Sequence, residues 1–146
     1  MSGTATLSTP YSVQHIVDHE HKHIHLKLDK LKAAIIKGKG LPSIFEAADA
    51  LIRKTQEHFQ EEEKIMAVAG YRDLPKHLLA HATLLKEIQE IKVGLMQRQI
   101  SSALQLSKFF SSSILDHFRE EDIKFEEAIR TAVNTGKLRK PNRRQK

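Results

Sequence analysis

The stretch that decides the fold is His58-Phe59-Gln60-Glu61-Glu62-Glu63-Lys64-Ile65-Met66. Within it, His58 and Glu62 are four residues apart, so an α-helix places both side chains on one face, one turn apart. A neutral imidazole and a carboxylate that point the same way form a natural pair of metal ligands. A single pair at this spacing also occurs by chance on a solvated helix face. The surrounding apolar residues decide between these two interpretations.

Breaker residues divide the sequence into four segments with helical periodicity. The expected helices run over about residues 12–37, 43–69, 73–93 and 101–134. Ser43 and Glu46 form a capping-box pattern at the start of the second helix, and Asp73 is the expected cap of the third. Gly70 and Gly94 mark the expected ends of the second and third helices. Four helices with short connections predict an all-α fold, an up-down-up-down four-helix bundle.

Each segment carries an apolar stripe with alternating steps of three and four residues, which is typical of a helix face buried in a bundle. Polar residues occupy stripe positions where leucine or isoleucine is expected. In the first three segments these residues are His21, His58, Glu62, His77 and His81. Burying such a group without a partner costs several kcal/mol. We therefore expect these side chains to satisfy each other or to hold a charged ligand.

The apolar stripe of the fourth segment reaches His117 in regular steps and resumes in phase with Asp122, Phe125 and Ile129. In a regular α-helix, the step of five would turn Asp122 roughly 140° away from His117. One extra residue in a π-bulge brings both side chains inward. The alternative is that Asp122 lies on the surface within a charged run, but this does not explain the phase of the stripe. We therefore predict a π-bulge between His117 and Asp122.

The predicted inward-facing set combines imidazoles and carboxylates at one level of the bundle: His21, His58, Glu62, His77, His81, His117 and Asp122. Seven ligands are too many for one tetrahedral zinc ion. They suit two six-coordinate ions of borderline softness, bridged by the two carboxylates and a solvent oxygen. One coordination position then remains open, which suits the end-on binding of a small molecule.

Five motifs occur together over about residues 12–130, namely Asp18-x-x-His21-Lys22, His58-Phe59-x-x-Glu62-Glu63-x-x-Met66, Gly70-Tyr71, His77-x-x-x-His81 and His117-x-x-x-x-Asp122. This combination resembles a hemerythrin-like domain of the bacteriohemerythrin type. The resemblance implies a four-helix bundle with a non-haem diiron centre, oxo- or hydroxo-bridged, that binds O2 reversibly. It further implies that three histidines hold one iron and two hold the other, with Glu62 and Asp122 as bridges. These sets are His77, His81 and His117, and then His21 and His58.

The resemblance also places an O2 pocket beside the iron with fewer histidines, with Ile24, His25, Ser113 and Ile114 as the presumed lining. Two of these residues depart from the family. His25 stands where hemerythrins usually carry phenylalanine, and Ser113 stands where they often carry tryptophan. Both changes make the pocket less apolar, which predicts faster autoxidation of the O2 complex, or peroxide or nitric oxide chemistry. The alternative is that His25 is a packed or rim histidine.

Four function classes follow from this site. The first is a non-enzymatic protein that binds O2, or another small diatomic or peroxide ligand, for carriage, storage or sensing. The second is a diiron enzyme that acts on peroxide or nitric oxide. The third is a diiron sensor that acts through a partner, and the fourth is a metal-free scaffold. A ferritin-type site is disfavoured because the one Glu-x-x-His match, Glu20 to His23, lies beside the apolar stripe.

Composition sets further bounds. A chain of 146 residues without cysteine has neither disulfides nor thiolate ligands, which excludes cysteine-held iron–sulfur clusters. No apolar run approaches 18 residues, and residues 1–11 form a polar arm without a signal-peptide pattern. We therefore expect one bundle domain over residues 12–134 in a cytoplasmic protein.

The net charge of +6 comes from the C-terminal tail. Residues 135–146 contain six basic side chains and no acid, so the rest of the chain has 18 basic and 18 acidic residues. We expect this tail to be disordered, and no aromatic interleaving supports a nucleic-acid partner. The stripes also predict that His15, His19 and His23 are surface residues rather than a second metal site. Glu57, Glu61 and Glu63 are expected on the exposed face of their helix.

Overall fold

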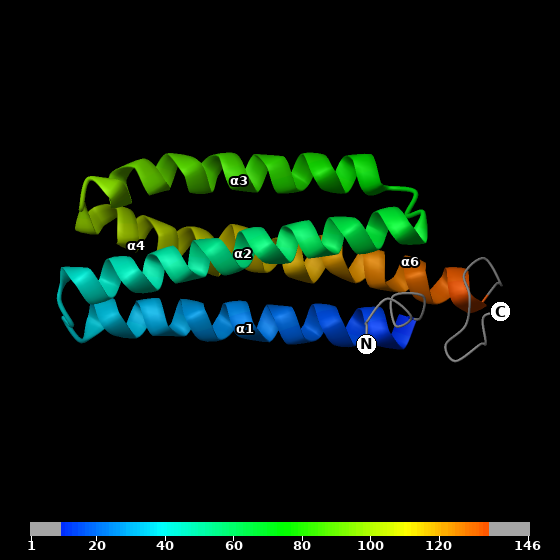
Figure 1. Ribbon diagram of the computed structural model, residues 1–146, viewed down its shortest axis with the longest axis horizontal. Coiled ribbons are helices and arrows are strands. Elements are labelled where there is room, and N and C mark those ends of the chain that lie inside the picture. Colours follow the sequence, from blue (N-terminus) through cyan, green and yellow to red (C-terminus); the bar gives the residue numbers. More distant parts are fainter. Residues whose placement is uncertain (1–9, 135–146) are drawn as a thin grey trace.

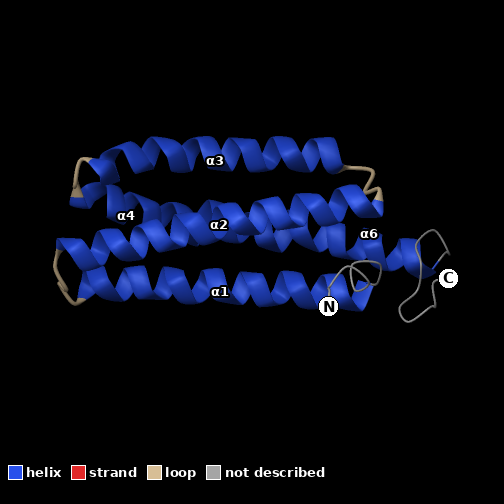
Figure 2. Ribbon diagram, viewed as in Figure 1, coloured by secondary structure: helices blue, strands red, loops and turns tan. Residues whose placement is uncertain are grey.

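The computed structural model describes residues 10–134, which form four antiparallel helical rods (Figure 1). The first three rods are α1 (Pro10–Ile36), α2 (Leu41–Ala69) and α3 (Leu74–Met96). The fourth rod is continuous and comprises α4 (Ile100–Phe109), a π-helical turn (Phe110–Ile114), α5 (Leu115–His117), a second π-helical turn (Phe118–Asp122) and α6 (Ile123–Asn134). All described elements are helices joined by short loops (Figure 2), so the predicted all-α up-down-up-down bundle is confirmed.

The two chain ends bear on the predicted domain limits. Helix α1 begins at Pro10, so the helix includes the last two residues of the polar arm expected over residues 1–11. Residues 1–9 and the basic tail over residues 135–146 lie outside the described part of the chain. The disorder expected for the tail therefore stays a prediction.

The start of α2 differs from the prediction. The helix begins at Leu41 with Gly40 as its N-cap, and no side chain caps it. Ser43 lies inside the first turn, so the predicted capping box with Glu46 is wrong. The physical reason is Pro42, whose fixed φ suits the first turn of a helix. The backbone N–H of Ile44 donates to Gly40 O at 3.1 Å and extends the helix back to that point.

Glycine ends α2 as predicted, but it does not end α3. Gly70 adopts the left-handed conformation with φ 69° after Ala69. Helix α3 instead continues through Gly94 to Met96. A Cβ atom on Gly94 would overlap Ser102 Oγ and lie 3.0 Å from Ser102 Cβ. Gly94 is therefore needed for the close approach of α3 and α4 rather than for a helix end.

The π-bulge predicted between His117 and Asp122 is confirmed by the π-helical turn Phe118–Asp122. This turn brings both side chains into the interior, where His117 is 6% and Asp122 is 0% exposed. The other π-helical turn, Phe110–Ile114, was not predicted. The steps from Phe110 to Ile114 and on to His117 are four and three residues, which are those of an ordinary α-helix.

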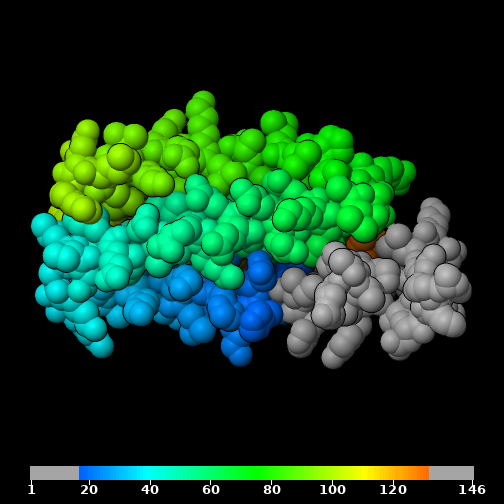
Figure 3. Space-filling model, viewed as in Figure 1, coloured from blue at the N-terminus to red at the C-terminus, as the bar shows by residue number. Residues whose placement is uncertain are grey.

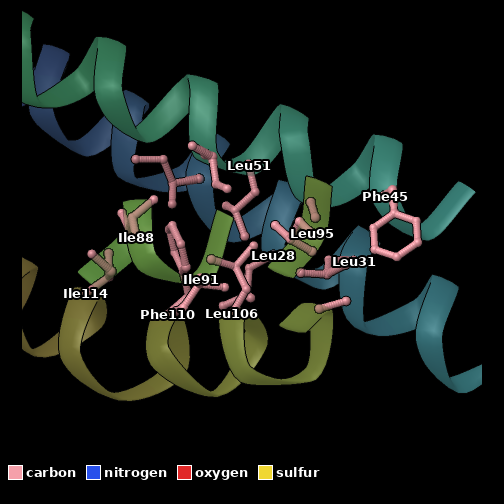
Figure 4. Packing of buried hydrophobic residues seen from close by; sticks show 14 of the residues in the cluster. Leu28, Leu31, Phe45, Leu51, Ile88, Ile91, Leu95, Leu106, Phe110 and Ile114 are labelled. Carbon is pink, nitrogen blue, oxygen red and sulfur yellow. The ribbon is translucent and has the colours of Figure 1, made fainter. Parts of the chain in front are cut away.

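The hydrophobic core is divided into two clusters. The larger one fills the end of the bundle near the α1–α2 and α3–α4 loops, and Leu51, Ile88 and Leu106 contribute to it from α2, α3 and α4 (Figure 4). The smaller cluster fills the opposite end and consists of Val17, Ile65, Met66, Phe125 and Ile129. The predicted polar residues of each stripe occur between the members of these two clusters, so the polar layer separates them.

The outer surface carries polar side chains together with exposed apolar ones such as Ile36, Val68 and Met96. Figure 3 shows side chains of α1, α2 and α3 along one face of the bundle. Among the described residues, the structure contains no helix that is both long enough and apolar enough to cross a membrane.

Candidate metal centre

All seven residues predicted to face inward meet in the polar layer between the two clusters. Six of them are buried, with exposed fractions between 0 and 6%: His58, Glu62, His77, His81, His117 and Asp122. The seventh, His21, keeps 16% of its side chain exposed. The arrangement follows from the stripes, because each side chain takes the place of an aliphatic residue on the inner face of its helix.

The ligand atoms form two groups that share their carboxylates. In one group, atoms of Glu62, His77, His81, His117 and Asp122 all lie within 4.8 Å of one another. In the other, atoms of His21, His58, Glu62 and Asp122 do so. Glu62 and Asp122 belong to both groups. The two groups thus share two carboxylates, with three imidazoles in one group and two in the other.

The Nε2 atoms of the histidines point at the two carboxylates. His77 Nε2 lies 3.2 Å and His81 Nε2 lies 3.1 Å from Glu62 Oε1. At the other carboxylate, His117 Nε2 lies 3.3 Å from Asp122 Oδ1. Helix α2, helix α3 and the fourth rod thus direct their ligand atoms into one small volume.

The remaining two histidines lie at the other carboxylate oxygen of Asp122. His21 Nε2 lies 2.7 Å from Asp122 Oδ2, and His58 Nε2 lies 3.6 Å from the same oxygen. These two histidines come from α1 and α2, which pack against each other along their length.

Unpaired polar atoms show that this cluster does not satisfy itself. His58 Nε2, Glu62 Oε2 and Asp122 Oδ1 are buried without a hydrogen-bond partner. His81 Nε2 and His117 Nε2 face each other at 3.0 Å, so at least one of the two must present a lone pair. Buried polar atoms without partners are costly. A cation in this volume supplies the missing partner to each of them, so the donor set fits a metal.

Two glutamates outside the cluster hold the rings in place. His58 Nδ1–H donates to Glu20 Oε1 at 2.9 Å, and His81 Nδ1–H donates to Glu63 Oε2 at 2.7 Å. A proton on Nδ1 leaves the Nε2 lone pair free for a metal, an arrangement that is common around metal sites. The expectation that Glu63 is simply exposed is wrong, because it is half-buried and hydrogen-bonded.

The two central carboxyls have opposite pKa shifts. Burial raises the pKa of Glu62 well above its usual 4.5, and the neighbouring charge of Asp122 adds to this. Burial also raises the pKa of Asp122, but the imidazoles around it, those of His117 and His21 foremost, outweigh burial and hold that pKa well below 3.8. The carboxylates of Glu62 and Asp122 belong to the same ligand groups, and at such short range they repel each other unless a proton or a cation lies between them.

Burial lowers the pKa values of two of the candidate histidine ligands, His81 and His21. Burial, together with the rings of His117 and His77, lowers the pKa of His81 to about 2. Burial also lowers the pKa of His21, although its bond to Asp122 opposes the shift. These two imidazoles are therefore neutral at pH 7, the form in which an imidazole binds metal.

Aromatic rings cover two of the candidate ligands. Phe59 stacks on His81 with ring centroids 4.0 Å apart and an interplanar angle of 11°. Phe118 stacks on His21 with ring centroids 3.9 Å apart and an angle of 13°. Both phenylalanines are at most 5% exposed, so each covers one face of the imidazole ring on which it stacks.

The four residues expected to line an O2 pocket differ in how deeply they are buried. Ile24 and Ile114 are fully buried and belong to the larger hydrophobic cluster. Ser113 is half-buried, whereas His25 is exposed, in keeping with the rim alternative. A shared pocket of these four residues stays a prediction.

A polar cleft of about 450 Å³ lies between α1 and the end of the fourth rod. His21 and Phe118 line it, together with Asp18, His25 and Glu126. Glu126 is only 9% exposed, and burial together with the charge of Asp18 raises its pKa to about 7. The cleft therefore connects solvent with the edge of His21, the candidate ligand that is least buried.

The fold and this cluster define the class: four-helix bundles that hold metal between histidine and carboxylate side chains of their core. The family follows from comparison with known proteins. The model of the hemerythrin HHE cation binding domain matches residues 12–129. The chain therefore belongs to the hemerythrin family, whose members bind non-haem iron and oxygen.

The curated relatives that match are distant. A bacteriohemerythrin of Pseudomonas aeruginosa is 27% identical over 119 residues, which cover 82% of this chain and 76% of the relative. A myohemerythrin of Theromyzon tessulatum is 25% identical over 103 residues, covering 68% of this chain and 80% of the relative. No solved structure matches the chain.

Proposed function

We propose that this chain is a non-haem diiron protein that binds O2 reversibly, for carriage, storage or sensing. The observation that carries the proposal is the pair of ligand groups that share Glu62 and Asp122. Three histidines, His77, His81 and His117, would hold one iron. His21 and His58 would hold the other, and the carboxylates would bridge. When bound, two ferrous ions would supply two electrons and an open coordination position.

The protein's own residues prepare the centre for this role. Glu20 and Glu63 orient the rings of His58 and His81 through Nδ1, so that Nε2 faces the cluster. Phe59 stacks on His81 and Phe118 stacks on His21, so each ring shields one face of a candidate ligand from water. The side with two histidines has fewer ligands, so the open position belongs there.

The test is to measure iron content and the visible spectrum before and after exposure to O2. We expect two irons per chain and a charge-transfer band that forms with O2 and disappears when O2 is removed. The variant Glu62→Gln should lose this behaviour, whereas Glu57→Gln, at an exposed position of the same helix, should keep it. A chain purified without iron, or one that oxidises irreversibly, would contradict the proposal.

A second candidate function is an enzyme that acts on peroxide or nitric oxide. The polar cleft at His21 favours it, because Glu126 and Asp18 bring protonatable groups to the less ligated side. Turnover with peroxide that is fast compared with decay of the O2 complex would favour the enzyme. The absence of turnover, together with a stable O2 complex, would favour the carrier.

A further inference from the structure

Two histidines outside the buried cluster form a close pair on the surface of α1. His19 and His23 are both exposed and four residues apart. Their ring centroids lie 4.4 Å apart with an interplanar angle of 55°. His21 is two residues from each of them, which places it roughly 160° away around the helix. The pair is therefore separate from the metal centre, and the proposed function does not use it.

The buried centre offers a comparison for this pair. His77 and His81 have the same spacing of four residues, on α3, and their ring centroids lie 4.5 Å apart. These two histidines converge on one carboxylate oxygen, Glu62 Oε1. The ring separation of His19 and His23 is thus nearly that of the two buried imidazoles that point at one atom. On the surface, however, water rather than protein would fill the other coordination positions of a bound ion.

Two imidazoles one helical turn apart form a chelate for a divalent transition metal ion. Such pairs are used in zinc sites built on helices. Imidazole suits copper, nickel and zinc, and affinity at a given site rises from Fe²⁺ through Ni²⁺ to Cu²⁺. An exposed site with two protein ligands therefore selects these ions over ferrous iron.

We propose that His19 and His23 form a surface site for one divalent ion of the copper, nickel or zinc class, with water at its other positions. The site is independent of the diiron proposal, because neither histidine belongs to either buried ligand group. The structure confirms the prediction that His19 and His23 lie on the surface, and the proposal adds a role for them there.

The test uses Cu²⁺ as the probe and the full-length, iron-loaded protein, in which the buried centre is already occupied. Calorimetry gives the stoichiometry and affinity, and electron paramagnetic resonance reports the nitrogen atoms bound to copper. We expect one Cu²⁺ per chain with coupling to two nitrogens. His19→Asn and His23→Asn should each weaken binding at least about tenfold, since even outer partners of metal ligands matter that much.

His25→Asn is the matched control, because His25 is exposed on the same helix and its histidine neighbour one turn away, His21, belongs to a buried ligand group rather than to the surface pair. His15→Asn is a second control, since His15 precedes His19 by four residues and the pair should bind without it. Equal affinity in wild type and His19→Asn would overturn the proposal. So would a loss in His25→Asn or His15→Asn as large as that in His19→Asn.

The failure of the surface-site proposal can be told apart from the failure of the diiron proposal. If the chain holds no iron, the diiron proposal fails. The difference in Cu²⁺ affinity between wild type and His19→Asn still tests the surface pair, because both proteins carry the same buried cluster. Circular dichroism should show equal helix content in the His19, His23 and His25 variants, since these three side chains are exposed.

Discussion

Glu63 accepts a hydrogen bond from His81 across the α2–α3 interface, although it lies beside rather than within the buried stripe. We predict that Glu63→Gln weakens iron retention roughly 10–100-fold, the usual effect of losing the carboxylate behind a metal-bound histidine. The measurement is the rate at which a chelator removes iron. Glu57→Gln is the control, because Glu57 is exposed on the same helix. Equal rates for both variants would show that the bond to His81 does not support the metal.

Glu126 makes stability depend on pH near neutrality. Burial and Asp18 raise its folded-state pKa to about 7, above its ordinary value of 4.5, while Arg130 opposes the shift. A raised pKa means that the folded state binds the proton more tightly. The stabilisation is therefore complete below pH 4.5 and is lost as the pH rises through 7.

We predict that wild-type protein loses more stability between pH 5 and 8 than Glu126→Gln, measured by urea unfolding of the metal-free protein. The control variant Glu120→Gln, at an exposed position of the same rod, should behave like wild type. An identical pH dependence in Glu126→Gln and wild type would rule out a role for this carboxyl.

At the scale of the helices, Gly94 shows how packing overrides local signals. Replacing glycine by alanine inside a helix normally adds about 1 kcal/mol of stability. Here the new Cβ atom would overlap Ser102 of α4, so we predict that Gly94→Ala destabilises the protein. The double variant Gly94→Ala, Ser102→Gly should recover part of the loss. Thermal unfolding measures both, and a more stable Gly94→Ala protein would show that α4 shifts freely.

The fourth rod shows which irregularities a sequence reveals. The π-helical turn at Phe118–Asp122 was predictable, because His117 and Asp122 are both polar interruptions of an apolar stripe that changes phase between them. The turn at Phe110–Ile114 leaves the apolar spacing unchanged and therefore has no signature in the stripe. The capping-box pattern at Ser43 was misleading, because a proline one residue earlier already favours the first turn of the helix. The helix therefore begins before Ser43 and needs no side-chain cap.

At the scale of the whole molecule, a layer of buried charge separates two hydrophobic clusters. Unpaired atoms of His58, Glu62 and Asp122 lie in that layer, so bound metal should stabilise the fold. A ligand at 100 times its Kd stabilises a protein by about 2.7 kcal/mol. We therefore predict that removing iron lowers the unfolding temperature, and that adding ferrous iron without oxygen restores it.

The control for this prediction is His58→Asn, which removes one ligand of the side with two histidines. Iron should raise its unfolding temperature less than that of the wild type. If iron raises both temperatures equally, the metal binds elsewhere.

The cytoplasmic location expected from the composition stays a prediction.

The sequence by itself determined the four helices, the seven inward-facing polar residues and the turn that aligns His117 with Asp122. These features are periodic along the chain, so they follow from local geometry. Only the tertiary structure decided which groups lie behind those ligands. Glu20 and His58 are 38 residues apart, and Glu63 and His81 are 18 apart. Such pairs depend on how neighbouring helices are rotated and aligned, and this is settled by the packing of the whole core.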